Sequence, residues 1–95
     1  MPKGYIVGHI DISDPDAFKL YAEAATKAQQ LYGARVLARG GRAEALEGEA
    51  RQRNVILEFD SFEAARAYYD SPEYQGARQL RADAADGDLL LLEGV

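Results

Sequence analysis

Apolar and polar positions follow two different periods along the chain, and these periods predict alternating strands and helices. Short apolar or alternating runs indicate strands over residues 3–12, 34–39, 54–60 and 88–93. Between the first two strands, apolar residues recur at helical spacing from Phe18 to Tyr32. Asp14-Pro15 marks the start of this helix and Gly33 its end. Two further helices are expected to begin at Ser61 and at Ser71-Pro72.

The order of these elements predicts the fold class. Strand, helix, strand, strand, helix, strand is the α+β, ferredoxin-like βαββαβ arrangement. Right-handed crossovers place the first and third strands at the centre of an antiparallel four-stranded sheet, with the helices on one face. Gly40-Gly41 predicts a bulge or a close approach of the backbone, and the polar residues 42–53 predict a long hairpin.

Two strands are apolar without alternation, which indicates that both faces of the sheet are covered. Residues 89–92 are four consecutive leucines, and residues 55–57 are Val-Ile-Leu. A sheet face in contact with water would alternate to polar residues. Because no residues are left for a second layer, we expect a homodimer whose two sheets pack face to face.

A glutamate within the third apolar run points to a candidate site, because a buried charge is costly without a partner. If Val55 and Leu57 face the helices, Glu58 faces the other way, and we expect Arg39 and His9 beside it on neighbouring strands. An acid, a cation and an imidazole around an apolar space could bind a small polar-headed molecule. The candidate catalytic residues are therefore His9, Arg39 and Glu58, and the candidate ligand-binding residues are Tyr5, Asp11, Leu37 and Leu91.

Two functions are consistent with this constellation. In a small cofactor-independent enzyme acting on an organic acid, lactone or aromatic, Arg39 would hold an oxyanion or carboxylate, and Glu58 or His9 would transfer a proton. In a non-catalytic dimeric binding or stress-associated module, an Arg39–Glu58 pair would only stabilise the dimer core, as buried charges usually do.

The composition of the chain bears on its domain number, its partners and its location. The 95 residues predict one domain over residues 1–95. A net charge of −5, with no basic face, argues against nucleic acid. The absence of cysteine, the single histidine and the lack of a phosphate-binding glycine motif predict no disulfide, no metal and no cofactor. No segment resembles a membrane span or a signal peptide, so we expect a cytoplasmic protein.

Several motifs along the chain resemble the DUF1330 family of small bacterial proteins. They are K-G-Y-I-V-G-H-I-D-I at residues 3–12, D-P at 14–15, R-G-G at 39–41, L-E-G at 46–48, E-F-D-S-F-E-A-A-R-A-Y-Y-D-S-P-E-Y at 58–74 and L-L-E-G at 91–94. The resemblance implies a ferredoxin-like domain of the dimeric α/β-barrel superfamily. That superfamily includes monooxygenases, haem-degrading enzymes and lactone isomerases, so the fold alone implies no activity.

Overall fold

A computed structural model describes all residues from 1 to 95 and contains the predicted elements in the predicted order. The elements are β1 (Gly4–Ile12), α1 (Pro15–Leu31), β2 (Arg35–Arg39), β3 (Arg53–Phe59), α2 (Phe62–Asp70), α3 (Pro72–Arg81) and β4 (Ala85–Glu93). No helix is long and apolar enough to cross a membrane.

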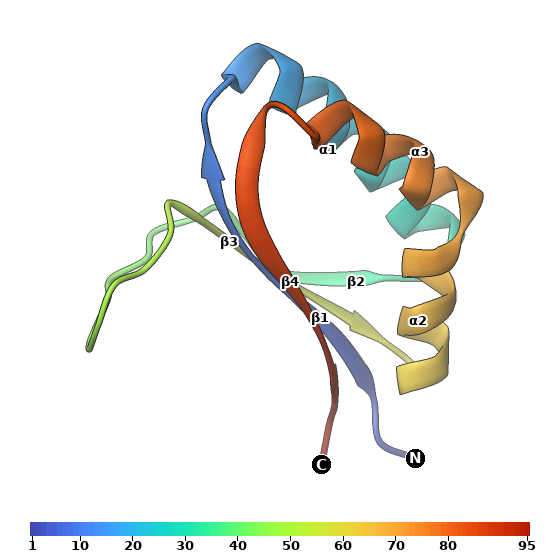
Figure 1. Cartoon of the computed structure of the whole chain (residues 1–95). Helices are drawn as coiled ribbons and strands as arrows, with labels where there is room; N and C mark the ends of the chain where they lie inside the picture. Colours follow the sequence, from blue (N-terminus) through green and yellow to red (C-terminus); the bar gives the residue numbers. More distant parts are fainter.

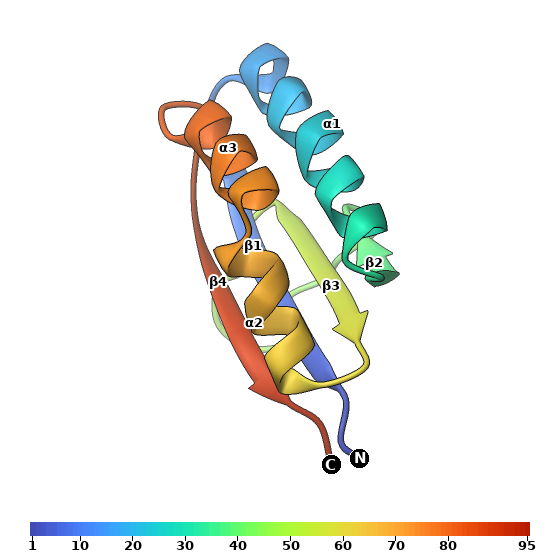
Figure 2. The same ribbon diagram turned by 90° about the vertical axis from the view of Figure 1, so that its right-hand side faces the viewer.

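The four strands form one antiparallel sheet in the order β2-β3-β1-β4, with β1 and β3 at its centre. All three helices lie on one face of this sheet (Figures 1 and 2), and the other face carries no layer. The long β2–β3 connection projects away from the helix layer (Figure 1). The ferredoxin-like fold predicted from the sequence is therefore confirmed.

The predicted start and end of α1 are present in atomic detail. The Asp14 side chain accepts a hydrogen bond from the Ala17 backbone nitrogen over 3.2 Å, and Pro15 is the first helical residue. At the other end, Gly33 follows the C-cap and has φ +73°, a left-handed conformation that glycine adopts without steric cost.

Ser71 joins α2 to α3 through two hydrogen bonds. Its hydroxyl accepts from the Tyr74 backbone nitrogen over 3.1 Å, which caps α3, and donates to the Tyr68 carbonyl over 2.6 Å at the end of α2. The two short helices are thereby held at a fixed bend, and they present Tyr68 and Tyr74 to the sheet as buried side chains.

The hydrophobic core lies between the helices and the sheet. On β1 the buried residues are Gly4, Ile6, Gly8 and Ile10, so Tyr5, Val7, His9 and Asp11 occupy the opposite, open face. On β3, Leu57 and Phe59 are buried against the helices. These orientations of β1 and β3 are the ones that the sequence predicted.

The prediction that Leu91 lines the site beside Glu58 on the open face is wrong. Leu91 pairs with Ile6 and Leu89 pairs with Gly8, and direct partners in an antiparallel pair share a face. Leu89 and Leu91 therefore pack on the helix side, and Leu90 and Leu92 lie on the open face. The strand also begins at Ala85 rather than Asp88, because pairing with β1 continues to Ile12 and includes Asp86 and Gly87.

Candidate small-molecule site

Glu58 lies on the open face of the sheet, as predicted, but its partner is not Arg39. Arg35, directly opposite on β2, donates from Nε to Glu58 Oε1 over 2.8 Å. The Tyr5 hydroxyl donates to Oε2 over 2.9 Å. The hydrogen bond from Arg35, and to a smaller extent the one from Tyr5, lowers the pKa of Glu58 below its ordinary value. Glu58 is therefore a doubly hydrogen-bonded carboxylate at neutral pH.

Arg39 lies on the helix side of the sheet, which corrects the predicted placement. A register shift between Val36 and Ala38 places Ala38 opposite Ile56 and Arg39 opposite Val55. Val55 packs against the core, so its direct partner faces the helices too. An extra residue in β2 thus reverses the alternation that would have kept Arg39 on the same face of the sheet as Glu58. Leu37 lies at this shift with an exposed side chain.

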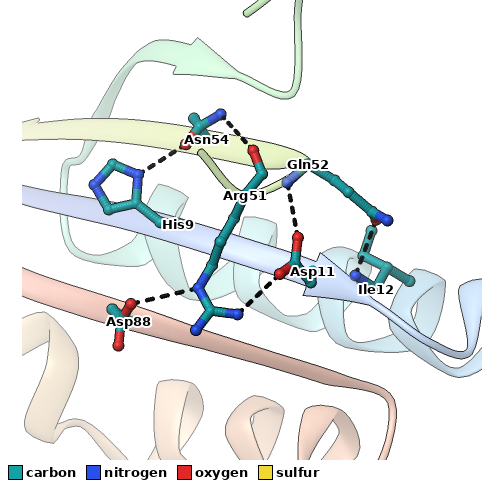
Figure 3. A network of polar contacts seen from close by, with 7 residues as sticks. All are labelled: His9, Asp11, Ile12, Arg51, Gln52, Asn54 and Asp88. Carbon is teal, nitrogen blue, oxygen red and sulfur yellow. Dashed lines mark hydrogen bonds and ion pairs between the residues drawn. The ribbon is translucent and has the colours of Figure 1, made fainter. Parts of the chain in front are cut away.

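His9 also lies on the open face, where Asn54 determines its tautomer (Figure 3). The Asn54 amide nitrogen donates to the Arg51 carbonyl over 3.3 Å, which leaves Oδ1 directed at His9 Nδ1 over 2.7 Å. Because Oδ1 can only accept, Nδ1 carries a proton. In the neutral ring, Nε2 is therefore the nitrogen with a free lone pair.

Asp11 is fully engaged within the chain (Figure 3). Its Oδ2 accepts from Arg51 over 2.9 Å, and its Oδ1 accepts from the Gln52 backbone nitrogen over 2.9 Å. Arg51 also forms an ion pair with Asp88 over 3.4 Å. Asp11 thus anchors the end of the β2–β3 connection to the sheet, which is a structural role. No group of three or more His, Asp or Glu side chains is arranged to hold a metal ion.

A cavity lies on the other side of the sheet, between the sheet and the helices. Its floor includes Ile6, Gly8 and Leu89, and its remaining wall is mostly aromatic and aliphatic. About 50 Å³ inside it is open to a water-sized sphere. One water needs roughly 10–15 Å³ on this measure, so the space holds a few waters or a small organic group.

Three of the polar side chains that line this mostly apolar cavity lie deep inside the protein: Tyr21, Gln29 and Tyr74. The Tyr21 and Tyr74 hydroxyls are 3.1 Å apart and buried. Gln29 is 9 % exposed; its amide group lies beside the Tyr68 hydroxyl, and its Oε1 is buried without a hydrogen-bond partner. The other such atom in the chain is Arg81 Nε, whose guanidinium lies over the Tyr21 ring. A buried acceptor without a donor is costly, so Gln29 is a position where a bound molecule or water would add a missing hydrogen bond.

Tyr21 and Tyr68 of the cavity wall keep their protons at neutral pH. Burial, more than any neighbouring group, raises the pKa of Tyr21 and that of Tyr68 well above the ordinary tyrosine range. No carboxylate and no imidazole lines the cavity. Its polar groups can therefore donate or accept hydrogen bonds around a ligand oxygen, and the usual proton acceptors of enzymes, a carboxylate or an imidazole, are not among them.

Of the predicted ligand-binding residues, only Tyr5 lies beside Glu58. Leu91 packs towards the core and Asp11 is held by Arg51, while Leu37 is at the exposed bulge. Two cavity residues could have been found in the sequence. Gln29 is a polar residue on the buried stripe of α1, and Arg53 shares the alternation of Val55 and Leu57.

Fold and site together define a ferredoxin-like domain with a helix-side cavity and an uncovered sheet face. The model of the family "Domain of unknown function (DUF1330)" matches residues 3–95, and the chain belongs to this family. No protein of curated function matches it.

Solved structures with the same fold are only distantly similar in sequence. The RPA0582 protein of unknown function from Rhodopseudomonas palustris is 20% identical, with a TM-score of 0.75 over 99% of this chain and 83% of that one. A dimeric ferredoxin-like protein of unknown function from Thermobifida fusca YX is 17% identical, with a TM-score of 0.66 over 97% and 91%. A protein from Caulobacter crescentus CB15, named as a candidate antibiotic biosynthesis monooxygenase, is 10% identical, with a TM-score of 0.64 over 99% and 91%.

Proposed function

We propose that this protein binds a small, mostly apolar molecule in the cavity between the helices and the sheet. The observation that carries the proposal is the buried, unpartnered Oε1 of Gln29, beside the paired hydroxyls of Tyr21 and Tyr74. An apolar wall with a few convergent polar groups is the usual composition of a small-molecule site. Because Oε1 accepts only, the group it would hold is a donor such as a hydroxyl.

Binding is favoured over catalysis by the types of side chain that line the cavity. Proton abstraction needs a base close to the substrate, and the lining residues include no carboxylate and no imidazole. Glu58 is separated from the cavity by the sheet and is held as a carboxylate by Arg35. The non-catalytic binding module is therefore the function that the geometry supports best.

The same proposal includes a homodimer formed through the open face of the sheet. Val7, Ile56, Leu90 and Leu92 form an apolar strip across its three contiguous strands β3, β1 and β4. Leu90 is 54% exposed and Leu92 is 42% exposed in the single chain. A second copy would remove these side chains from water, at roughly 25 cal/mol for each Å² buried. The solved structure from Thermobifida fusca YX is itself described as dimeric.

A cofactor-independent enzyme is the second candidate, and His9 is the observation that favours it. With Nδ1–H directed at Asn54, the neutral ring offers Nε2 as a proton acceptor on the open face. In a face-to-face dimer this nitrogen would lie between the two sheets, with Glu58 at the other end of the face. The substrate would then be a small organic acid, lactone or aromatic, and proton transfer would take place between the subunits.

The variant Gln29→Met tests the binding proposal. It keeps the length of the side chain and removes the unpartnered acceptor, so we expect a higher melting temperature and weaker binding of 4-hydroxybenzamide, a small phenol used as the probe. Gln79→Met, on the exposed side of α3, is the matched control and should change neither property.

Two results would count against the proposal. Loss of stability in Gln29→Met would mean that Gln29 Oε1 has a partner within the protein. A probe whose NMR chemical-shift changes fall on the open face, and not on residues such as Gly8 and Ala25 of the cavity lining, would mean that the cavity is not the site.

A further inference from the structure

Basic side chains gather where the helix-side cavity opens to solvent. A shallow pocket adjoins the cavity and shares Ala22, Thr26, Arg39 and Arg53 with it. The charged residues that line this mouth are Lys19, Glu23, Lys27, Arg39 and Arg53. Four cations and one acid thus surround one opening in a chain whose net charge is −5.

These cations are free of carboxylate partners within the chain. The ion pairs of the protein involve Arg35, Arg51 and Arg66, and none of them involves a residue of the mouth. Glu23 makes no ion pair either. Unpaired cations that converge at a cavity attract an anion more strongly than the same charges spread over the surface.

The two arginines of the mouth are close neighbours on one face of the sheet. Arg39 lies opposite Val55, and Arg53 precedes Val55 by two residues, so the two are diagonal partners on the helix face. The backbones of such partners lie roughly 7–8 Å apart. Two long side chains at this spacing can both contact one small anion. Arginine presents a planar fork of donors that fits a carboxylate.

The backbone at Gly40 makes room for this arrangement. Gly40 has φ +67°, and a Cβ atom there would collide with the Arg53 guanidinium. The Arg53 guanidinium also lies 5.4 Å from the centre of the Phe18 ring, at the edge of the aromatic wall. Arg53 is therefore held across the mouth, with its polar end beside the apolar interior.

We infer that Arg39 and Arg53 form an anion site, and that the molecule held in the cavity is a single-ring or short-chain carboxylate. Its apolar body lies between the helices and the sheet, its carboxylate lies between the two arginines, and a hydroxyl reaches the acceptor of Gln29. This inference rests on the proposed binding function and adds the charge of the ligand to it.

A matched pair of probes tests the anion site separately from the binding of a small molecule in the cavity. 4-Hydroxybenzoate and 4-hydroxybenzamide have the same ring and hydroxyl and differ in charge at the other end. We expect the full-length protein to bind the acid about tenfold more tightly or better, because hydrogen bonds from arginine to a charged carboxylate are stronger than those to a neutral amide. Increasing salt should weaken binding of the acid and leave the amide unchanged.

Substitutions at the mouth complete the test. Arg39→Gln, at an exposed position, should remove most of the preference for the acid by lowering the affinity for the acid, and Arg53→Gln should act alike. Arg42→Gln, in the exposed connection, is the control and should change neither affinity. Equal binding of both probes at the cavity would overturn the anion site and leave the binding function intact. Binding of neither probe would overturn both.

Discussion

Arg35 and Glu58 are direct partners on neighbouring strands, and the Arg35 Nε lies 2.8 Å from Glu58 Oε1. Together with the Tyr5 hydroxyl, this contact fills both oxygens of the carboxylate. The Glu58 carboxylate, which interrupts the apolar strand β3, therefore has both of its partners within the same chain. It stabilises one end of the open face and is not free to act as a base.

This relationship predicts how stability depends on acid. The pKa of Glu58 is lower in the folded protein than its ordinary value of 4.5, so its stabilising contribution is present above pH 4.5 and is lost as the pH falls through the lowered pKa. We expect Glu58→Gln to have a lower urea midpoint than the wild type at pH 7. In acid, the midpoints of the two proteins should become equal. Glu47→Gln, in the exposed connection, is the control. Equal midpoints of the wild type and Glu58→Gln at pH 7 would contradict the prediction.

Alkaline conditions should unfold the protein through its buried tyrosines. The pKa values of Tyr21 and Tyr68 are raised above the ordinary 10.0, so above pH 10 the unfolded chain releases protons that the folded chain keeps. Stability should then fall by about 1.4 kcal/mol per pH unit for each of these groups. Absorbance at 295 nm should rise in two stages, the second together with loss of circular dichroism. A single stage without unfolding would disprove this.

Ser71→Ala should destabilise the junction of α2 and α3. The substitution removes the cap of α3 and the bond to the Tyr68 carbonyl, and the loss of a cap typically costs about 1 kcal/mol and up to about 2. Urea denaturation measures the change. Ser13→Ala is the control, because the Ser13 side chain makes no hydrogen bond and only its backbone nitrogen bonds to Ala84. Equal losses in the two variants would exclude a special role for Ser71.

Leu90→Lys should separate the proposed dimer into monomers. It places a charge in the centre of the open face, where a second sheet would bury it without a partner. Light scattering after size-exclusion chromatography should give the dimer mass for the wild type and the monomer mass for the variant. Leu80→Lys on α3 tests a leucine of similar exposure, 46% against 54%, and should remain dimeric. A monomeric wild type at micromolar concentration would refute the dimer itself.

Much of the fold could be predicted because each element carries its own local signal. Asp14-Pro15 and Ser71-Pro72 mark helix starts, and both caps are present as hydrogen bonds. Alternation along β1 separates Ile6 from His9 correctly. These signals depend on residues close together in the chain, so one sequence is enough to interpret them.

The site was harder to predict because its geometry depends on contacts between distant residues. Four consecutive leucines are the same in either orientation, so the face of Leu91 follows only from its pairing with Ile6. The bulge after Val36 has no glycine to mark it, yet it moves Arg39 to the helix side. The cavity joins Gln29, Tyr74 and Arg53, which lie on three elements far apart in the chain.

The most direct measurement is a crystal structure of the full-length protein, purified without added ligand and then soaked with 4-hydroxybenzoate. The proposed function predicts electron density for the ring between the helices and the sheet, with its hydroxyl at Gln29 Oε1 and its carboxylate at Arg39 and Arg53. A cavity closed by the side chains of Tyr21 and Tyr74, with Gln29 Oε1 bonded inside the protein and no density for the soaked acid, would contradict it.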